Sequence, residues 1–151
     1  MDLKNLTQEY LENSRVMQLA TSVDNKPWVC NIHFLVDSDF NFYWISEEGT
    51  RHSNDISQNP NVAITIKIHE DIPTENYVIG VSIEGSAGLL APNDVEKIGF
   101  EYVSRLGKSP ALIENILSGK SLLRFYKLTP KKIVLFDTKN FPTAPRQEYT
   151  I

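Results

Sequence analysis

The sequence predicts a small antiparallel β-barrel with helices packed outside it. Runs rich in aromatic and β-branched residues indicate about seven strands. Short turns link neighbouring strands, which favours antiparallel hairpins and a sheet that closes on itself. Glycines at 80, 85 and 88 interrupt one long strand, as bends in a barrel do. At 151 residues, of which 41% are hydrophobic, the chain is expected to form one domain over 1–151 with a single core.

The first half of the chain begins with an amphipathic helix. Leu3, Leu6, Tyr10 and Leu11 recur at helical spacing there. Two hairpin turns follow, and an Asn-Pro pair stops a second, short helix. The predicted elements are a helix over 3–15, strands over 16–21, 28–36 and 40–45, turns at 24–27 and 37–39, and a helix over 50–58.

The second half alternates strands with one helical stretch. The segment 93–96 resembles a capping box for a helix that Gly107 ends. Thr129-Pro130 predicts a break between the last two strands, and the prolines after Asn140 predict an irregular end. The predicted elements are strands over 62–68 and 77–90, an acidic loop over 69–75, helices over 95–106 and 110–117, and strands over 122–128 and 132–136.

Composition excludes several classes of function. A net charge of -4 indicates no broad basic surface, so nucleic acid is not an expected partner. The single cysteine, Cys30, excludes an intrachain disulfide. His33, His52 and His69 have no metal-ligand spacing, and no metal site is expected. Because no apolar run approaches the length of a signal core or a membrane span, we expect a cytoplasmic protein with no membrane partner.

The segment 46–52 carries the strongest chemical signal. It is a strand-to-helix turn, where backbone N–H groups are unpaired and the helix dipole is positive. Thr50, Arg51 and His52 add a hydroxyl, a guanidinium and an imidazole, which are donors suited to a phosphate monoester. The alternatives are an N-cap role for Thr50 and solvent-exposed side chains at Arg51 and His52. The turn predicts a phosphate grip for a nucleotide cofactor.

The order of these motifs resembles the pyridoxamine 5'-phosphate oxidase-like flavoproteins, which share an FMN-binding split barrel. The resemblance covers roughly residues 14 to 138. It rests on Ile45-Ser46, Thr50-Arg51-His52 and the Asn-Pro pair after the helix. A short bacterial subgroup is most similar, since it shares the tryptophan at 28, the asparagine at 31, the aspartate at 37 and the segment 47–52.

The resemblance implies an FMN cofactor and a homodimer. Thr50, Arg51 and His52 would hold the phosphate, and Ser46 and Ile45 would meet the ring or the ribityl chain at the strand end. Trp28 and Asn31 would lie beside the isoalloxazine. For Trp28 and Ile45, ordinary packing in the barrel is the alternative.

Two departures from the family pattern argue against oxidation of pyridoxamine phosphate. The oxidases carry an arginine and a lysine in the second strand, where this chain has Val29 and Phe34. Their closing double-arginine motif is also missing, because the chain ends with Arg146 alone. We therefore expect a different small-molecule substrate.

The predicted function is an FMN-dependent oxidoreductase of unknown substrate. The alternatives are a flavin-binding or sensing protein without turnover, a haem- or deazaflavin-binding relative, and a purely structural protein. The sequence identifies no catalytic residue. Cys30 and His33 are three apart on a strand and point to opposite faces, so they do not form a nucleophile–base pair.

Overall fold

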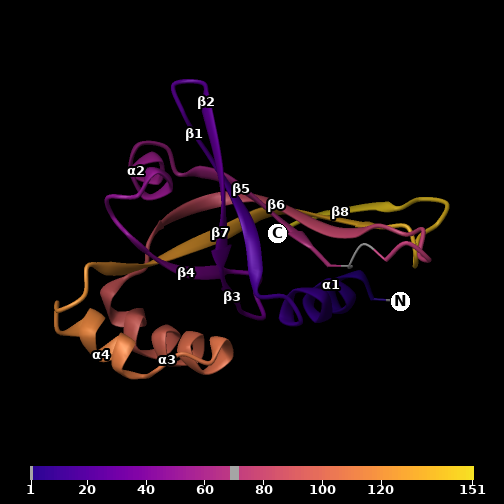
Figure 1. Cartoon of the computed structure of the whole chain (residues 1–151). Helices are drawn as coiled ribbons and strands as arrows, with labels where there is room; N and C mark the ends of the chain where they lie inside the picture. Colours follow the sequence, from indigo (N-terminus) through magenta and orange to yellow (C-terminus); the bar gives the residue numbers. More distant parts are fainter. Residues whose placement is uncertain (1, 69–71) are drawn as a thin grey trace.

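The computed structural model describes residues 2–68 and 72–151, in which an antiparallel sheet curls into a half-barrel flanked by helices (Figure 1). The strand order is β2-β1-β5-β6-β7-β4-β3, and β8 pairs with β7. The predicted fold class is confirmed. The strands are β1 (Val16–Val23), β2 (Lys26–His33), β3 (Leu35–Val36), β4 (Phe42–Glu47), β5 (Asn61–Lys67), β6 (Ile79–Leu89), β7 (Leu123–Asp137) and β8 (Arg146–Thr150).

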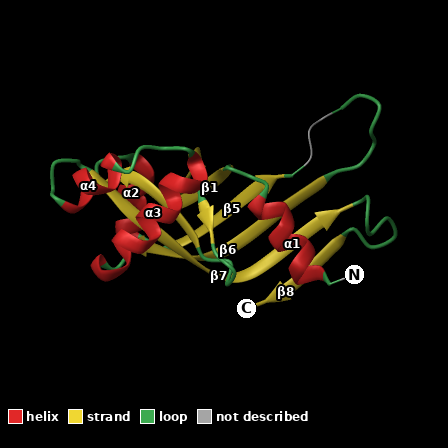
Figure 2. Ribbon diagram, turned by 90° about the horizontal axis from the view of Figure 1, so that it is seen from below, coloured by secondary structure: helices red, strands yellow, loops and turns green. Residues whose placement is uncertain are grey.

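The helices gather at the two ends of the sheet. Figure 2 shows α2, α3 and α4 at one end, and α1 with β8 and both termini at the other. In the described part of the chain, no helix has the length and apolar character needed to cross a membrane. The helices are α1 (Leu3–Glu12), α2 (Arg51–Gln58), η1 (Pro92–Asp94, a 3-10 turn), α3 (Val95–Leu106) and α4 (Ala111–Leu117).

Strand β4 serves two cores, because successive side chains of a strand point to opposite faces. Phe42 and Trp44 are fully buried in the main core inside the curled sheet. Tyr43 and Ile45 belong instead to a second cluster beneath α3 and α4, around Tyr102. The alternation anchors both layers to the strand that leads into α2.

One predicted helix boundary and one predicted helix cap are corrected. The first helix ends at Glu12 rather than residue 15, since Asn13 is its C-cap. The predicted capping box over 93–96 is wrong, because the residue that precedes α3 is Asp94 rather than Asn93, and Asp94 makes no side-chain capping hydrogen bond. Asp94 already has helical backbone angles at the end of the 3-10 turn, whereas a capping residue is extended. Gly107 ends α3 in the left-handed conformation (φ 66°), as predicted.

The predicted break at Thr129-Pro130 is wrong. Strand β7 runs over 15 residues and pairs with β6 from Tyr126 to Asp137, on both sides of Pro130. The pairing shifts register between Glu84 and Gly85, and Gly85 lies opposite Pro130. A Cβ atom on Gly85 would lie 2.3 Å from the Thr129 carbonyl oxygen. The absent side chain therefore lets the two backbones approach where the proline interrupts the ladder.

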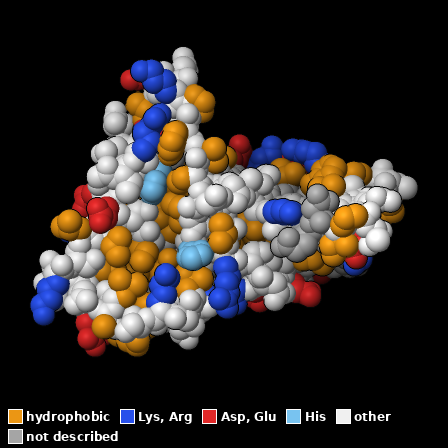
Figure 3. Space-filling view, in the orientation of Figure 1, with side chains coloured by type: hydrophobic (Ala, Val, Ile, Leu, Met, Phe, Trp, Pro, Cys, Tyr) orange, Lys and Arg blue, Asp and Glu red, His pale blue; other side chains and the backbone are white. Residues whose placement is uncertain are grey.

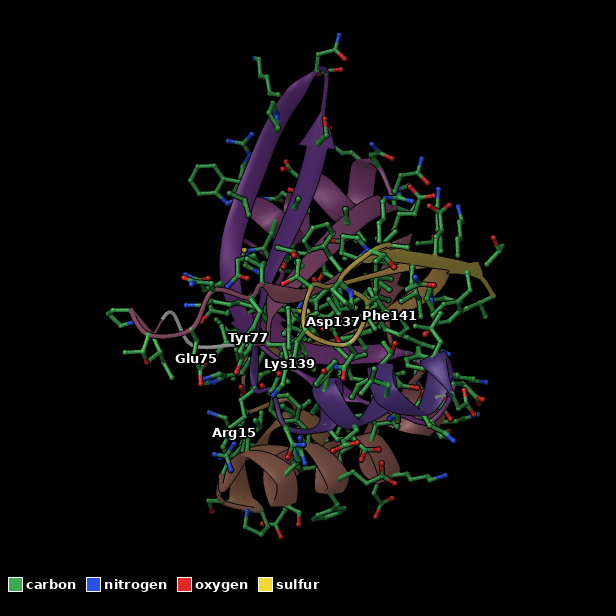
Figure 4. All side chains as sticks on the ribbon, turned by 90° about the vertical axis from the view of Figure 1, so that its right-hand side faces the viewer. Arg15, Glu75, Tyr77, Asp137, Lys139 and Phe141 are labelled. Carbon is green, nitrogen blue, oxygen red and sulfur yellow. The ribbon has the colours of Figure 1, made fainter. Side chains whose placement is uncertain are left out.

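The predicted irregular C-terminal end is also wrong, because β8 pairs with β7 over residues 146–150. The buried Asp137 organises the connection between them: its carboxylate accepts the N–H groups of Lys139 (3.0 Å) and Asn140 (2.9 Å) and the Tyr10 hydroxyl (3.0 Å). Figure 4 shows Asp137 and Phe141 at this connection, with Lys139 beside Tyr77. Of the predicted loop over 69–75, residues 69–71 lie outside the described residues.

Candidate functional site

Helix α2 joins the two sides of the curled sheet. It follows directly from β4, which lies near one end of the strand order, and it packs against β1 and β2 at the other end. Figure 1 shows α2 beside the β1–β2 hairpin, which projects from the body of the molecule. This placement brings five of the predicted residues together, namely Trp28, Ser46, Thr50, Arg51 and His52, which we call the α2 cluster.

Thr50 caps α2. Its backbone is extended (φ -68°, ψ 156°), and its Oγ1 accepts the Ser53 N–H at 3.4 Å. The intrahelical pattern begins with the Asn54 N–H donating to the Thr50 carbonyl at 2.9 Å. The N–H groups of Arg51 and His52 precede that pattern, so they have no partner within the helix. The N-cap role is confirmed, and it leaves two backbone donors at the helix start.

The Arg51 guanidinium is held on one edge and one face. Its Nε donates to the Asp55 carboxylate, at 3.2 Å from Oδ2, and its central carbon lies 5.1 Å from the centre of the Trp28 ring. The Thr21 hydroxyl donates to the same carboxylate at 2.7 Å. Among the residues that the structure describes, the two terminal nitrogens of Arg51 donate no hydrogen bond. These nitrogens are available to an anion.

His52 is a neutral member of the cluster. Its Nε2 lies 2.7 Å from the Ser46 Oγ and 3.2 Å from the Thr50 Oγ1. Burial lowers the pKa of His52 below its ordinary value, and the nearby Asp55 charge opposes that shift only in part. The imidazole is therefore uncharged near pH 7 and exchanges hydrogen bonds with two hydroxyls.

Two predicted residues lie apart from the cluster. Trp28 pairs with Thr21 in the β1–β2 register, whereas Asn31 pairs with Gln18 and points to the opposite face. The Gln18 amide donates to the Asn31 Oδ1 at 2.8 Å. Ile45 packs toward α3 and α4.

Two residues of the site, Asp55 and Thr21, were not predicted from the sequence. Asp55 stands four residues after Arg51 on a predicted helix, a spacing that places opposite charges side by side. The position of Thr21 opposite Trp28 follows from the register of the β1–β2 hairpin. The two-residue turn at Asp24 and Asn25 sets that register, and the positive φ angles of these two turn residues (52° and 59°) are typical of a tight hairpin.

The surface around the cluster is partly apolar. In Figure 3, hydrophobic side chains gather between α2 and α3, while lysine and arginine side chains lie along the β1–β2 hairpin. A cavity of about 310 Å³ adjoins α2 and is lined by Ser53, Ser57, Leu89 and Tyr126, among others. The Tyr126 ring stacks on Trp44 with centroids 5.7 Å apart. Helix α2 thus adjoins a pocket of a size for a small molecule, although the five residues of the α2 cluster do not line it.

Solved structures with the same fold include proteins of different description. A heme binding protein from Mycobacterium smegmatis is 12% identical with a TM-score of 0.77, over 99% of this chain and 58% of that chain. General Stress Protein 26 from Bacillus anthracis is 18% identical with a TM-score of 0.67, over all of both chains. An FAD-binding protein from Mesorhizobium loti is 14% identical with a TM-score of 0.64, over 88% of this chain and 92% of that chain.

At these identities the structural matches show the fold alone. No curated protein matches the sequence. The model of one family, described as pyridoxamine 5'-phosphate oxidase, matches residues 3–136. That match runs from the start of α1 to the penultimate residue of β7 and includes the whole α2 cluster. The chain therefore belongs to the pyridoxamine 5'-phosphate oxidase family.

Proposed function

We propose that this protein binds FMN and acts as an FMN-dependent oxidoreductase on a small-molecule substrate. The observation that carries the proposal is the Arg51 guanidinium. It is oriented by Asp55 and Trp28 at the start of α2, and its terminal nitrogens are uncommitted among the described residues. A guanidinium with two parallel donors matches the geometry of phosphate oxygens.

The residues present fit a phosphate monoester. The N–H groups of Arg51 and His52 lie at the N-terminal end of α2, where the helix dipole favours an anion. The Arg51 side chain, whose terminal nitrogens donate no hydrogen bond to the described residues, belongs to the first residue of the same helix. His52 adds a ring nitrogen within reach of two hydroxyls. The neutral imidazole donates one hydrogen bond, and a phosphate dianion would favour its protonation.

Three side chains of the cluster have separate roles in the proposal. Arg51 binds the phosphate, Trp28 covers one face of the guanidinium, and Ser46 holds the His52 ring from β4. The apolar surface between α2 and α3 suits a flat aromatic ring (Figure 3). A bound flavin would supply electron or hydride transfer, while the protein orients it and limits access of water.

The comparisons show the fold alone and do not distinguish a flavin from a haem. One relative is described as an FAD-binding protein and another as a heme binding protein. The hydrogen bonds of the His52 Nε2 atom to Ser46 and Thr50 argue against His52 as an axial ligand of a haem. The involvement of Asn31 and Ile45 in holding the ring stays a prediction.

The test compares FMN with riboflavin, which lacks the phosphate. The wild-type protein is expected to bind FMN more tightly than riboflavin. Arg51→Ala should lower the affinity for FMN by about 10- to 100-fold, since charge-assisted hydrogen bonds contribute about 1.5–3 kcal/mol. Riboflavin affinity should stay within about twofold. Arg105→Ala, in the last turn of α3, is the control and should change neither affinity.

Equal affinity of the wild type for FMN and riboflavin would contradict the proposal that the α2 cluster binds the FMN phosphate. The absorption spectrum of the purified protein distinguishes the alternatives, because bound haem gives a Soret band and a flavin gives two bands in the blue and near ultraviolet. Mass identification of the released molecule separates FMN from a deazaflavin.

A further inference from the structure

We propose that Asp55 is a positioning residue that aims the Arg51 guanidinium at the cofactor phosphate, and that Thr21 fixes Asp55 in the required orientation. This inference rests on the proposed binding of FMN. It assigns a role to two residues outside the turn that carries the donors.

The Arg51–Asp55 pair differs from an ordinary surface ion pair. The Arg51 side chain is 45% exposed, but the Asp55 side chain is only 7% exposed. A buried carboxylate needs partners for its oxygens, because water no longer solvates it. Asp55 has two: the Arg51 Nε on its own helix and the Thr21 hydroxyl from β1. A group so costly to bury is suited to holding another group in place.

The contacts restrict the guanidinium in two directions. Asp55 takes the Nε edge, so the opposite edge with the terminal nitrogens points away from the carboxylate. Trp28 covers one face, at 5.1 Å from the ring centre. A planar group fixed at one edge and one face has little freedom left, and its donors are oriented before the ligand arrives.

The four residues close a loop of contacts between α2 and the hairpin. Thr21 and Trp28 are direct partners in the β1–β2 register, with Thr21 contacting Asp55 and Trp28 contacting Arg51. The hairpin therefore holds the arginine through both of its strands. A lysine at position 51 could not be held in this way, because it has no second donor edge.

Asp55 also cancels the charge of Arg51 in the ligand-free protein. With His52 neutral, the α2 cluster together with Asp55 carries no net charge until a ligand binds. The phosphate contacts must then come from oriented donors rather than from a general positive field. Discrimination between FMN and riboflavin should consequently depend on how Asp55 sets the donors.

The experiment measures FMN and riboflavin affinities of the full-length protein by fluorescence titration, with melting temperatures alongside. Asp55→Asn keeps the shape of the side chain but removes the charge. This variant should lower the affinity for FMN by about tenfold and leave the affinity for riboflavin within about twofold of the wild-type value. Thr21→Val should reduce FMN affinity in the same direction, and Thr21→Ser, which keeps the hydroxyl, should retain the wild-type ratio.

A double-mutant cycle separates positioning from a merely structural role. If Asp55 acts through Arg51, Asp55→Asn has no further effect on FMN affinity in an Arg51→Ala background. The inference is overturned if Asp55→Asn lowers both affinities equally, if it changes only the melting temperature, or if its effect persists without Arg51.

Failure of the inference is distinguishable from failure of the proposed function. If the wild type prefers FMN through Arg51 but Asp55→Asn keeps the wild-type ratio, only the positioning role is refuted. If the wild type binds both flavins equally and Arg51→Ala changes neither affinity, both proposals fail.

Discussion

Substitution of Gly85 by alanine tests how closely the two long strands approach. A Cβ atom at Gly85 would lie 2.3 Å from the Thr129 carbonyl oxygen, 3.0 Å from a Leu128 methyl carbon and 3.1 Å from the Pro130 Cα. Two of these three neighbours are backbone atoms, which cannot swing aside as a side chain does. Strands β6 and β7 must therefore separate at the point where their register shifts.

The expected loss of stability follows from this contact. Overpacking a well-packed site costs about 1–3 kcal/mol, and a clash with backbone belongs at the upper end. Replacing glycine by alanine also stabilises the folded state by about 0.5–1 kcal/mol, because the unfolded chain loses conformational freedom. The net expectation is about 2 kcal/mol of destabilisation, which for a protein of this size lowers the melting temperature by about 4–8 °C.

Gly88→Ala is the matched control on the same strand. No atom lies within 4 Å of its Cβ position, and neither glycine has a positive φ angle. The control should be neutral or more stable by up to about 1 kcal/mol. Urea unfolding followed by the fluorescence of the buried Trp44 measures both variants. A Gly85→Ala midpoint equal to the wild type, or an equal loss in Gly88→Ala, would refute the steric argument.

Three further predictions concern the site and the assembly. Burial keeps the pKa of His52 below 6.5, so the unfolded state binds the proton first as the pH falls. The free energy of unfolding should therefore decrease as the pH drops below 6.5. The His52→Gln variant should lack this pH-dependent loss in urea titrations at several pH values. FMN-loaded protein should form no detectable pyridoxal phosphate from pyridoxamine phosphate and oxygen. Arg124 is paired with Glu48, and no second phosphate-binding site is evident among the described residues. Robust turnover that is lost in Arg51→Ala would overturn this prediction. Light scattering should give twice the chain mass of 17.2 kDa. The reason is exposed apolar surface: Val29 on the hairpin is 60% exposed, and the outer sheet face has apolar surface to cover. A monomer with FMN bound would contradict the homodimer.

Local patterns in the sequence determined most of the elements. The helical spacing at the N-terminus, the turn predicted at 24–27, which the structure narrows to 24–25, and the Asn-Pro stop after α2 each depend on neighbours within a few residues. The same holds for the start of α2, where Thr50 caps the helix as its residue type indicates. The separation of Trp28 from Asn31 was also within reach of the sequence, since residues three apart on a strand face opposite ways.

The tertiary structure alone decided what the local patterns could not. Strand β8 forms because β7 offers it an edge, so Pro142 and Pro145 restrict the connection without preventing the pairing that follows. Strand β7 continues through Pro130 because Gly85 on another strand gives it room. Both outcomes depend on partners distant in the sequence.

The same division runs through the candidate site. The sequence places Arg51 and Asp55 one helical turn apart, and so it determines their pairing. It does not determine that Thr21 reaches Asp55 or that Ser46 reaches His52. Those contacts join separate elements, and they form only because the curl of the sheet brings β1, β2 and β4 to one helix. Spacing along the chain fixes which donors stand together, and the packing of distant strands fixes where they point.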